Sequence, residues 1–383
     1  MTWVFWLAAA LIAYAYFGYL GWLWLRAQWR PWPVRRGRVE AMVSVVMVVR
    51  NEEGVLEQKL RNLLELDYPG KNFQIVVVSD GSTDRTEAIL REHASDPQVH
   101  VLLNQLAGGK AMGLNAAMSM VQGDIVVFTD ARQQIEPGAI RLLMENFADA
   151  EVGAVSGELM LGDAGKGETG RGMGLYWRIE KRVRELEAAA GSVVGATGAL
   201  YAVRRELVVE IAPDTILDDV FIPMNVAKQG FRVVFEARAR AWDRPDLGSS
   251  REFRRKVRTL TGNYQLLQLA PWLLHKENPL RFEFVSHKLI RLLVPFALLL
   301  ALAASGFLPG AFYRVAFWAQ LGFYGLSLLG LAQLNLGPMS RISDAAYTFV
   351  ALNTAALLAF VNFVTGRKTI WMPPVLHREI KAR

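Results

Sequence analysis

Polar side chains suited to binding a charged ligand follow directly on three short apolar runs of this sequence. The runs lie at 43–49, 75–79 and 125–129 and are almost wholly apolar. Runs of this kind indicate strands that are buried on both faces of a parallel sheet. Such sheets bind ligands at the carboxyl ends of their strands. The candidate ligand-binding residues at those ends are Asn51, Glu52, Asp80, Gly81, Ser82, Asp130 and Arg132.

The acid after the second run, Asp80, is expected to contact a nucleotide. Asp84 lies three residues before Glu87, a pattern typical of the start of a helix. With Asp84 engaged there, the carboxylate of Asp80 is left free to face a ligand. We interpret it as the group that holds the base and ribose of a nucleotide.

Three further groups of charged residues, around Lys110, Asp218 and Arg255, are also candidates. Taken singly, most of the candidates, old and new, have an ordinary structural explanation. A lysine such as Lys110 is commonly solvated, Asp80 could fix a turn, and adjacent acids commonly start a helix. Asp130 could form a local ion pair with Arg132. The functional interpretation depends on the order and spacing of the whole series. The further candidates are Lys110, Asp218, Asp219, Arg255 and Arg258.

The elements that must position these residues alternate between strand and helix. Helices are predicted at 55–66, 84–92, 108–121 and 177–190, with another opening at 215–219. Further strands are predicted at 99–103 and 151–161, and 230–241 is interpreted as a closing pair of strands. This alternation predicts an α/β fold with a doubly wound, mostly parallel sheet. Right-handed crossovers would bring Asn51, Asp80 and Asp130 to one edge.

Composition excludes several kinds of site. The 383 residues include no cysteine, so disulfides, thiolate metal sites and cysteine nucleophiles are excluded. The formal net charge is +7, and the basic residues cluster beside apolar blocks. That placement suits anionic headgroups or phosphate-bearing substrates. No nucleic-acid-binding signature is present, and we expect no nucleic acid partner.

The first 25 residues predict a membrane span. Trp3 to Leu25 carries no charge and is long enough to cross a bilayer as a helix. A signal peptide is the alternative, but the stretch is too long, has no basic start and lacks a clear cleavage site. Arginines follow at 26, 30, 35, 36 and 38, which by the positive-inside rule place the next domain in the cytoplasm.

The last third of the chain also predicts membrane contact. A basic cluster at 251–258 precedes a segment, 264–274, with the composition of an interfacial helix, and 281–288 is a second amphipathic segment. Three uncharged blocks of spanning length follow at 292–312, 315–336 and 345–366. Three crossings would leave the basic tail outside, against the charge rule. The tail is then an exception, or one block lies in the interface or re-enters.

Several motifs together resemble the family-2 inverting glycosyltransferases. They are Val-Val-Arg-Asn-Glu-Glu, Val-Ser-Asp-Gly-Ser-Thr-Asp, Gly-Gly-Lys-Ala, Phe-Thr-Asp-Ala-Arg and Leu-Asp-Asp. The runs 252–258 and 286–291 look like the membrane-bound, cellulose-synthase-like branch of polysaccharide synthases. The resemblance covers about residues 40–300 and implies a GT-A fold. The motifs are specific for the family and weak for the substrate.

The resemblance implies a role for each candidate. Asp80 is similar to the acid that contacts the nucleoside, with Asn51 and Glu52 in the same pocket. Lys110 looks like the residue beside the diphosphate, where a point positive charge is useful. Asp130 resembles the first acid of a D-x-D motif that holds Mg²⁺ or Mn²⁺. Asp219 resembles the general base that takes the proton of the acceptor hydroxyl.

Two departures from the family pattern bear on metal and acceptor. Arg132 replaces the second acid of the metal motif, so either Asp130 suffices with substrate phosphates or the guanidinium of Arg132 supplies part of the cation's charge. The Q-x-x-R-W motif is matched only by Arg255-Lys-Val-Arg258-Thr259. Arg258 can still neutralise the departing diphosphate. The missing tryptophan weakens the case for a long saccharide acceptor.

The sequence thus predicts a membrane-embedded inverting glycosyltransferase that uses a nucleotide-diphosphate sugar, with uridine as the expected nucleoside. A polysaccharide acceptor with export of the product is placed ahead of a lipid acceptor. A non-catalytic scaffold in an export complex, with export partners, is the alternative from another class. We expect the bacterial inner membrane, with the catalytic domain in the cytoplasm. The expected parts are 1–38 (first span), 39–250 (GT-A domain), 251–291 (interfacial helices), 292–366 (three spans) and 367–383 (tail).

Overall fold

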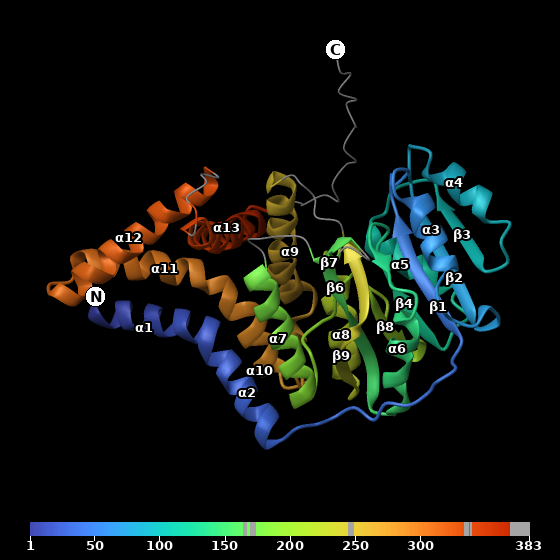
Figure 1. The fold of residues 1–383 in the computed structure, drawn as a ribbon, viewed down its shortest axis with the longest axis horizontal. Helices are drawn as coiled ribbons and strands as arrows, with labels where there is room; N and C mark the ends of the chain where they lie inside the picture. The colour runs from blue at the N-terminus through green and yellow to red at the C-terminus, as the bar shows by residue number, and fades with distance from the viewer. Residues whose placement is uncertain (164–166, 169–173, 244–248, 333–336, 338, 368–383) are drawn as a thin grey trace, which may run out of the picture.

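A nine-stranded sheet forms the centre of the computed structural model (Figure 1). The structure describes residues 1–163, 167–168, 174–243, 249–332, 337 and 339–367. The strand order is β3-β2-β1-β4-β8-β6-β9-β5, and β7 pairs with β6. The strands are β1 (Val43–Val49), β2 (Phe73–Asp80), β3 (Val99–Asn104), β4 (Ile125–Phe128), β5 (Gln134–Ile135), β6 (Val152–Asp163), β7 (Gly167–Glu168), β8 (Tyr201–Arg204) and β9 (Arg232–Asp243).

The predicted fold class is confirmed: the sheet is mostly parallel and is covered by helices on both faces. Strands β1 to β4 are parallel to one another, and β6 is parallel to β9. Every residue of β1 and β2 is buried, as their unbroken apolar runs predict. One face is covered by α3 (Leu56–Leu64), α4 (Thr86–His93) and α6 (Ala139–Glu145), and the other by α5 (Lys110–Met118) and α8 (Asp218–Lys228).

The register of the first strands brings the predicted ligand-binding ends together. Val49 pairs with Ser79, and Asp80 pairs with Asn104, so β1, β2 and β3 end at the same edge. Phe128 of β4 pairs with Val46 of β1, which places Asp130 at that edge as well. The carboxyl edge therefore carries the acids that the sequence singles out.

The expectation of a closing pair of strands at 230–241 is wrong. A single strand, β9, runs from Arg232 to Asp243 beside β6. The strand carries a bulge at 236–239, where four residues of β9 lie opposite the single residue Gly157 of β6. Glu236 in this bulge is buried and pairs with Arg238 at 2.8 Å, and the chain continues in the same strand.

Within the described part of the chain, three helices are long and apolar enough to cross a membrane: Thr2–Trp29, Arg281–Phe307 and Met339–Val364. The first comprises α1 (Thr2–Ala13) and α2 (Tyr19–Trp29), joined by a π-helical turn. The second joins α10 (Arg281–Phe284) to α11 (Ile290–Phe307), so the amphipathic segment predicted at 281–288 is continuous with the apolar block after it. The third is α13 (Met339–Val364); α12 (Ala311–Leu331) forms a helix as predicted but is not among these spans.

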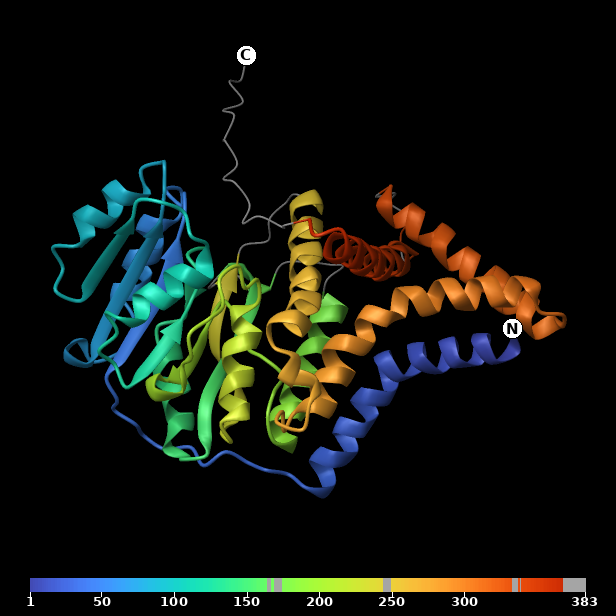
Figure 2. The same ribbon diagram turned by 180° about the vertical axis from the view of Figure 1, so that it is seen from behind.

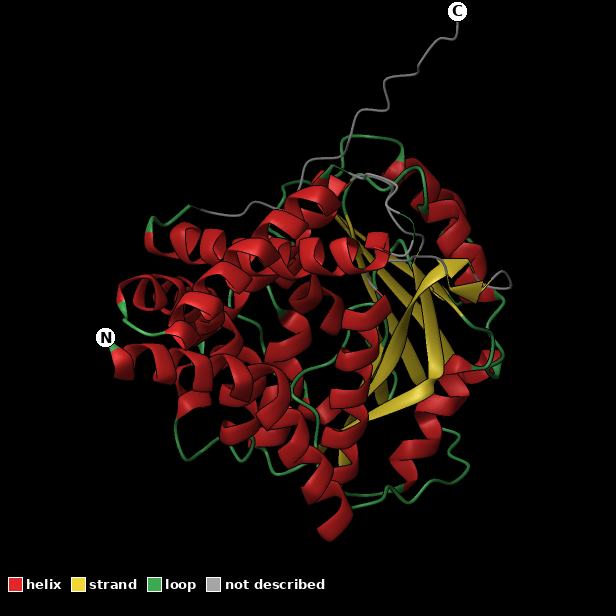
Figure 3. Ribbon diagram, turned by 60° about the vertical axis from the view of Figure 1, so that its left-hand side comes forward, coloured by secondary structure: helices red, strands yellow, loops and turns green. Residues whose placement is uncertain are grey.

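Helices from both ends of the chain gather on one side of the sheet (Figure 3). Between them and the sheet stand α7 (Gly174–Ala190) and α9 (Ser249–Leu269). Seen from behind, α9 lies between the sheet and α13 (Figure 2). The interfacial helix predicted at 264–274 is instead the end of α9 and a short 3₁₀ turn, because Ala270-Pro271 interrupts the helical hydrogen bonds.

A buried cluster of charges joins the first candidate membrane helix to the sheet domain. His287 lies between two carboxylates, with Nδ1 2.8 Å from Glu187 Oε1 and Nε2 3.0 Å from Glu180 Oε1. Both ring nitrogens can donate only when the imidazole is protonated. The hydroxyl of Tyr19 donates to Glu187 at 2.7 Å, and Arg291 donates to Glu180 at 2.8 Å. The cluster fixes α2, α7 and the start of α11 to one another.

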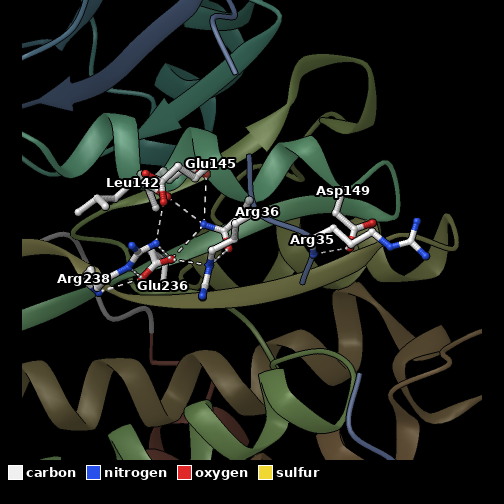
Figure 4. Close-up of polar contacts among 9 residues, drawn as sticks. Arg35, Arg36, Leu142, Glu145, Asp149, Glu236 and Arg238 are labelled. Atoms are coloured by element: carbon white, nitrogen blue, oxygen red, sulfur yellow. Dashed lines mark hydrogen bonds and ion pairs between the residues drawn. The ribbon is translucent and has the colours of Figure 1, made fainter. Parts of the chain in front are cut away.

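The segment between α2 and β1 runs along the opposite edge of the sheet from the ligand-binding ends (Figure 1). The backbone N–H of Arg35 donates to Asp149 Oδ2 at 3.1 Å, and Arg36 Nε lies 3.1 Å from Glu236 Oε2 (Figure 4). The same close-up shows Arg238 beside Glu236 and Glu145. Arg36, one of the basic residues that predict the inside face, therefore also anchors the segment to the domain.

Candidate active site

Lys110 links two acids of the series across the edge of the sheet. Its ammonium donates to Asp130 Oδ1 at 2.9 Å and lies 3.1 Å from Asp218 Oδ2. It is the first residue of α5, and Gly109 before it adopts a φ of 91°, a conformation that favours glycine. Burial acts to lower the pKa of Lys110, but the charges of Asp130, Asp218 and Asp219 outweigh it and raise the pKa. The ammonium therefore stays charged.

Asp219 lies in the first turn of α8, close to the same group. Its Oδ2 accepts a hydrogen bond from the backbone N–H of Gly198 at 3.1 Å. A Cβ added at Gly198 would lie 3.3 Å from Asp219 Oδ2 and 3.6 Å from Asp130 Oδ2, so both carboxylates converge on this point. Burial, with the charge of Asp218, raises the pKa of Asp219 to about 6. A half-buried carboxylate with such a pKa can accept a proton near neutral pH.

The carboxylate of Asp80 is engaged by the backbone, whereas the sequence led us to expect it unpaired; its contact with a nucleotide stays a prediction. Its side chain is fully buried, and its two oxygens accept the backbone N–H groups of Gly108 at 2.7 Å and Gly109 at 3.0 Å. The reason is that the amides at the start of α5 need acceptors, and the end of β2 supplies one. Asp80 therefore holds the loop that presents Lys110.

Asn51 and Ser82 are hydrogen-bonded to each other at the ends of β1 and β2, and Gly81 lies between Asp80 and Ser82 in the same loop. Asn51 adopts a φ of 54°, and its side-chain oxygen accepts the N–H of Thr83 at 2.7 Å. Its own N–H donates to Ser82 Oγ at 3.2 Å. A Cβ at Gly81 would lie 2.6 Å from the backbone nitrogen of Ala107, so only glycine fits. Left-handed backbone at a non-glycine residue is common at functional sites.

Glu52 lies at the same edge, and its pKa is shifted by burial and by the charges of the site. Burial raises the pKa of Glu52 to about 7; Arg132 opposes this shift, and the charges of Asp130 and Asp84 add to it. Part of the Glu52 population is therefore neutral at neutral pH. Its backbone N–H donates to Thr86 Oγ1 at 2.9 Å, which fixes the loop after β1 to the start of α4.

Asp243 is a residue of the site that the sequence interpretation missed. This buried acid, the last residue of β9, accepts a hydrogen bond from Gln133 at 3.0 Å and lies 3.8 Å from Arg132 and 3.4 Å from Arg255. It joins the loop after β4 to α9. The sequence offered only a weak signal, because Asp243 ends a strand as Asp80 does but that strand contains several charged residues. Arg258, one turn further along α9, is half-buried and has no ion pair with any described residue.

Lys59 was missed as well. It is buried on α3 and donates to Thr129 Oγ1 at 3.0 Å and to the carbonyl of Gln133 at 2.6 Å, on either side of Asp130 and Arg132. Burial lowers the pKa of Lys59 to about 7, with the charge of Asp130 opposing. Its spacing from Leu56, Leu60 and Leu63 places it on the apolar face of α3, a signal that the sequence contained.

The donor set at Asp130 fits a divalent cation that takes most of its ligands from a substrate. Oδ1 of Asp130 is occupied by Lys110, whereas Oδ2 faces the point near Gly198. Among the described residues no group of three or more acids or histidines could hold a metal alone. Mg²⁺ commonly binds through one or two carboxylates together with phosphates and water. Asp130 can serve as that carboxylate.

Comparison with known proteins places this arrangement in a family. The family model "Glycosyl transferase family 2" matches residues 44–211. Beta-monoglucosyldiacylglycerol synthase of Nostoc sp. is 28% identical over 184 residues, which are 46% of this chain and 39% of that protein. Poly-beta-1,6-N-acetyl-D-glucosamine synthase of Staphylococcus epidermidis is 22% identical over 238 residues, 60% of this chain and 56% of that protein. The chain thus spans from about two-fifths to just over half of these relatives.

A solved structure shares the fold over nearly the whole chain. The mannosyltransferase PcManGT from Pyrobaculum calidifontis, solved in complex with GDP-Man and Mn²⁺, superposes with a TM-score of 0.73 at 22% identity and covers 95% of this chain and 99% of that one. At this identity the likeness shows the fold. The fold is GT-A-like, and residues 44–211, which match the family 2 model, lie in this α/β part of the chain.

Proposed function

We propose that this protein is a membrane-anchored inverting glycosyltransferase that uses a nucleotide-diphosphate sugar, with uridine as the expected nucleoside. The observation that carries the proposal is the convergence of Asp130 and Asp219 beside Lys110 at the carboxyl edge of the sheet. This edge is where α/β sheets bind ligands. The relatives named as synthases of a glucosyl lipid and of an N-acetylglucosamine polymer support the same reaction class.

In the proposed mechanism Asp219 removes the proton of an acceptor hydroxyl as that oxygen attacks the anomeric carbon. The bond from this carbon to the diphosphate oxygen breaks on the opposite face, so the configuration inverts. The raised pKa of Asp219 suits a base that works near neutral pH. Lys110 contributes a fixed positive charge beside the departing diphosphate, and Arg255 and Arg258 of α9 add to it.

The donor nucleotide would lie over the ends of β1 and β2. Asn51, Glu52 and Ser82 line this edge, and Asp80 acts by holding the Lys110 loop in place. Mg²⁺ or Mn²⁺, held by Asp130, would supply charge neutralisation to the donor phosphates when bound. Arg132, which stands in place of a second acid, is held 3.8 Å from Asp243 and adds positive charge near the same loop.

Two acceptors remain candidates, a growing polysaccharide and a lipid. Thr259 is a specific observation in favour of the lipid. Thr259 is exposed, and its hydroxyl donates to the Arg255 carbonyl of its own helix at 3.0 Å. A threonine has no aromatic ring on which an acceptor sugar could stack, unlike the tryptophan of the family motif. If α13 crosses a bilayer, the bilayer lies next to α9, which packs against α13. A lipid acceptor could then approach the site from the membrane.

The proposed topology places Met1 outside and the catalytic domain in the cytoplasm, in a bacterial inner membrane. The arginines after α2 support this orientation. If α11 and α13 cross while α12 does not, the chain returns to the domain's side at Arg367. The basic end of the chain would then obey the charge rule, which four crossings would violate.

The reaction can be tested with the full chain in lipid vesicles. Labelled nucleotide sugars are supplied one at a time, and release of the nucleotide is measured. Label in the organic phase as a single sugar identifies a lipid acceptor, and a polymer retained on gel filtration identifies a polysaccharide. Absence of binding to any nucleotide sugar, with or without Mg²⁺ or Mn²⁺, would contradict the proposal and favour a scaffold in an export complex.

A further inference from the structure

The loop that leads into the proposed base is held by α9. The side chain of Gln265 makes two hydrogen bonds to this loop: Nε2 donates to the carbonyl of Asp214 at 2.9 Å, and Oε1 accepts the N–H of Ile216 at 3.0 Å. Asp214 adopts a φ of 64°, an uncommon conformation that needs support from its surroundings. Asp219 follows Ile216 by three residues, so Gln265 fixes the backbone just before the base.

Close packing supports the same contact one helical turn earlier. A Cβ added at Gly262 would lie 2.6 Å from Leu217 Cγ and 3.0 Å from Ile216 Cγ2. The absence of a side chain at Gly262 therefore lets α9 approach the loop directly. Gly262 and Gln265 are three residues apart and lie on one face of the helix.

The neighbouring residue of the same turn binds a candidate membrane helix. The ring of Tyr264 stacks on Phe363 of α13, with centroids 5.4 Å apart and planes at 23°, and lies 5.8 Å from Phe360. One turn of α9 thus contacts α13 on one side and the loop before Asp219 on the other. A change in the position of α9 against the membrane helix would reach the loop through Gln265 and Gly262.

We propose that Gln265 is a positioning residue that sets the place and the burial of Asp219. This inference rests on the proposed function, since it gives Asp219 the role of the base. The two hydrogen bonds of Gln265 keep the 214–219 segment packed under α9, which limits the exposure of the half-buried Asp219 to water. Loss of both bonds would loosen this segment, misplace the base and expose it to solvent.

The test compares Gln265→Met with Gln268→Met in the full chain in lipid vesicles. Methionine has nearly the shape of glutamine but makes neither hydrogen bond, and Gln268 is exposed on the same helix. For Q265M we expect faster deuterium uptake at 212–221, a kcat lower by roughly 10- to 100-fold and a donor KM near that of the wild type. The acid limb of kcat/KM should move to lower pH, because a solvated carboxylate has a lower pKa.

Three results would overturn the inference: unchanged deuterium uptake at 212–221, an unchanged kcat, or a reduced kcat with the acid limb in its original place. A merely structural role would lower the active fraction without moving that limb. If Q265M does not fold, Gln265→Glu keeps the acceptor for Ile216 and should show an intermediate kcat; a wild-type profile would contradict the proposal. An inactive wild type would refute the proposed function instead, and deuterium uptake would still test the contact.

Discussion

The ammonium of Lys110 lies 2.9 Å from Asp130 Oδ1, which joins the first residue of α5 to the acid after β4. Lys110 follows β3 and Asp130 follows β4, and these strands are separated in the sheet by β2 and β1. The two residues meet because the four parallel strands end at the same edge of the sheet. The contact places a fixed positive charge where the proposed reaction develops negative charge.

Lys110→Ala should lower kcat by roughly 100-fold, because it removes the charge proposed to face the departing diphosphate and leaves Asp130 and Asp218 without their cation. Lys110→Arg should recover part of the rate. The matched control is Lys71→Ala, which removes an exposed lysine far from the acids. Equal kcat values for K110A and K71A would refute the role of Lys110.

The rate should fall as the pH drops below about 6, because Asp219 must be deprotonated to accept a proton and its pKa is raised to about 6. The measurement is kcat/KM against pH, which reports on the free enzyme. Glu52, whose pKa is raised to about 7, is proposed to lie beside the donor rather than the acceptor. Glu52→Gln should therefore leave the limb near pH 6 in place. An acid limb that disappears in E52Q would assign it to Glu52 instead.

Asp80→Asn should destabilise the fold by about 1–3 kcal/mol, because an amide has a single oxygen for the two N–H groups that Asp80 accepts. Asp124→Asn, at an exposed acid before β4, is the control. Thermal unfolding of both variants in the same detergent checks the difference. Wild-type stability of D80N, combined with loss of nucleotide binding, would instead restore Asp80 as a ligand-contacting residue.

Asp80 illustrates what the sequence could not provide. The apolar run before it predicted β2 and its place at the carboxyl edge, and the same reasoning placed Asn51 and Asp130. Which partner its carboxylate would find depends on the loop at 105–109, whose path no local pattern specifies. A strand-ending acid can therefore be located from sequence, while its hydrogen bonds need the tertiary structure.

Two residues of the site, Asp243 and Lys59, were harder to predict, because their contacts are with residues far away in the sequence. Both residues belong to the site because they contact the loop around Arg132. This loop lies more than a hundred residues from Asp243 and about seventy from Lys59 in the sequence. In β9 the buried Glu236 interrupts the apolar pattern, and its pairing with Arg238 is visible only once strand and partner are placed. The single long strand was missed for that reason.

His287→Leu should lower the free energy of unfolding by about 3–5 kcal/mol, because it leaves Glu187 buried without a cationic partner, while Glu180 keeps Arg291. Thermal unfolding checks this, with His275→Leu, at an exposed histidine, as control. A melting temperature of H287L equal to that of H275L would contradict the charge cluster.

The same cluster predicts the direction of a pH effect on stability. Burial alone would raise the pKa of Glu187, but the charge and hydrogen bond of His287 outweigh it and lower the pKa. The stabilisation is therefore present above the ordinary glutamate pKa and is lost as pH falls through the lowered value. Unfolding of Glu187→Gln should depend less on pH in that acidic range than unfolding of the wild type, and an identical dependence would contradict the assignment.

The role of Asp219 as the base is tested most directly by sugar transfer in Asp219→Asn. The full chain in lipid vesicles is supplied with the nucleotide sugar that the wild type uses, and transfer and donor binding are measured on the same sample. The account predicts that D219N binds the donor as the wild type does and transfers sugar at least about 100-fold more slowly. Transfer at the wild-type rate would show that another group accepts the proton and would contradict the account.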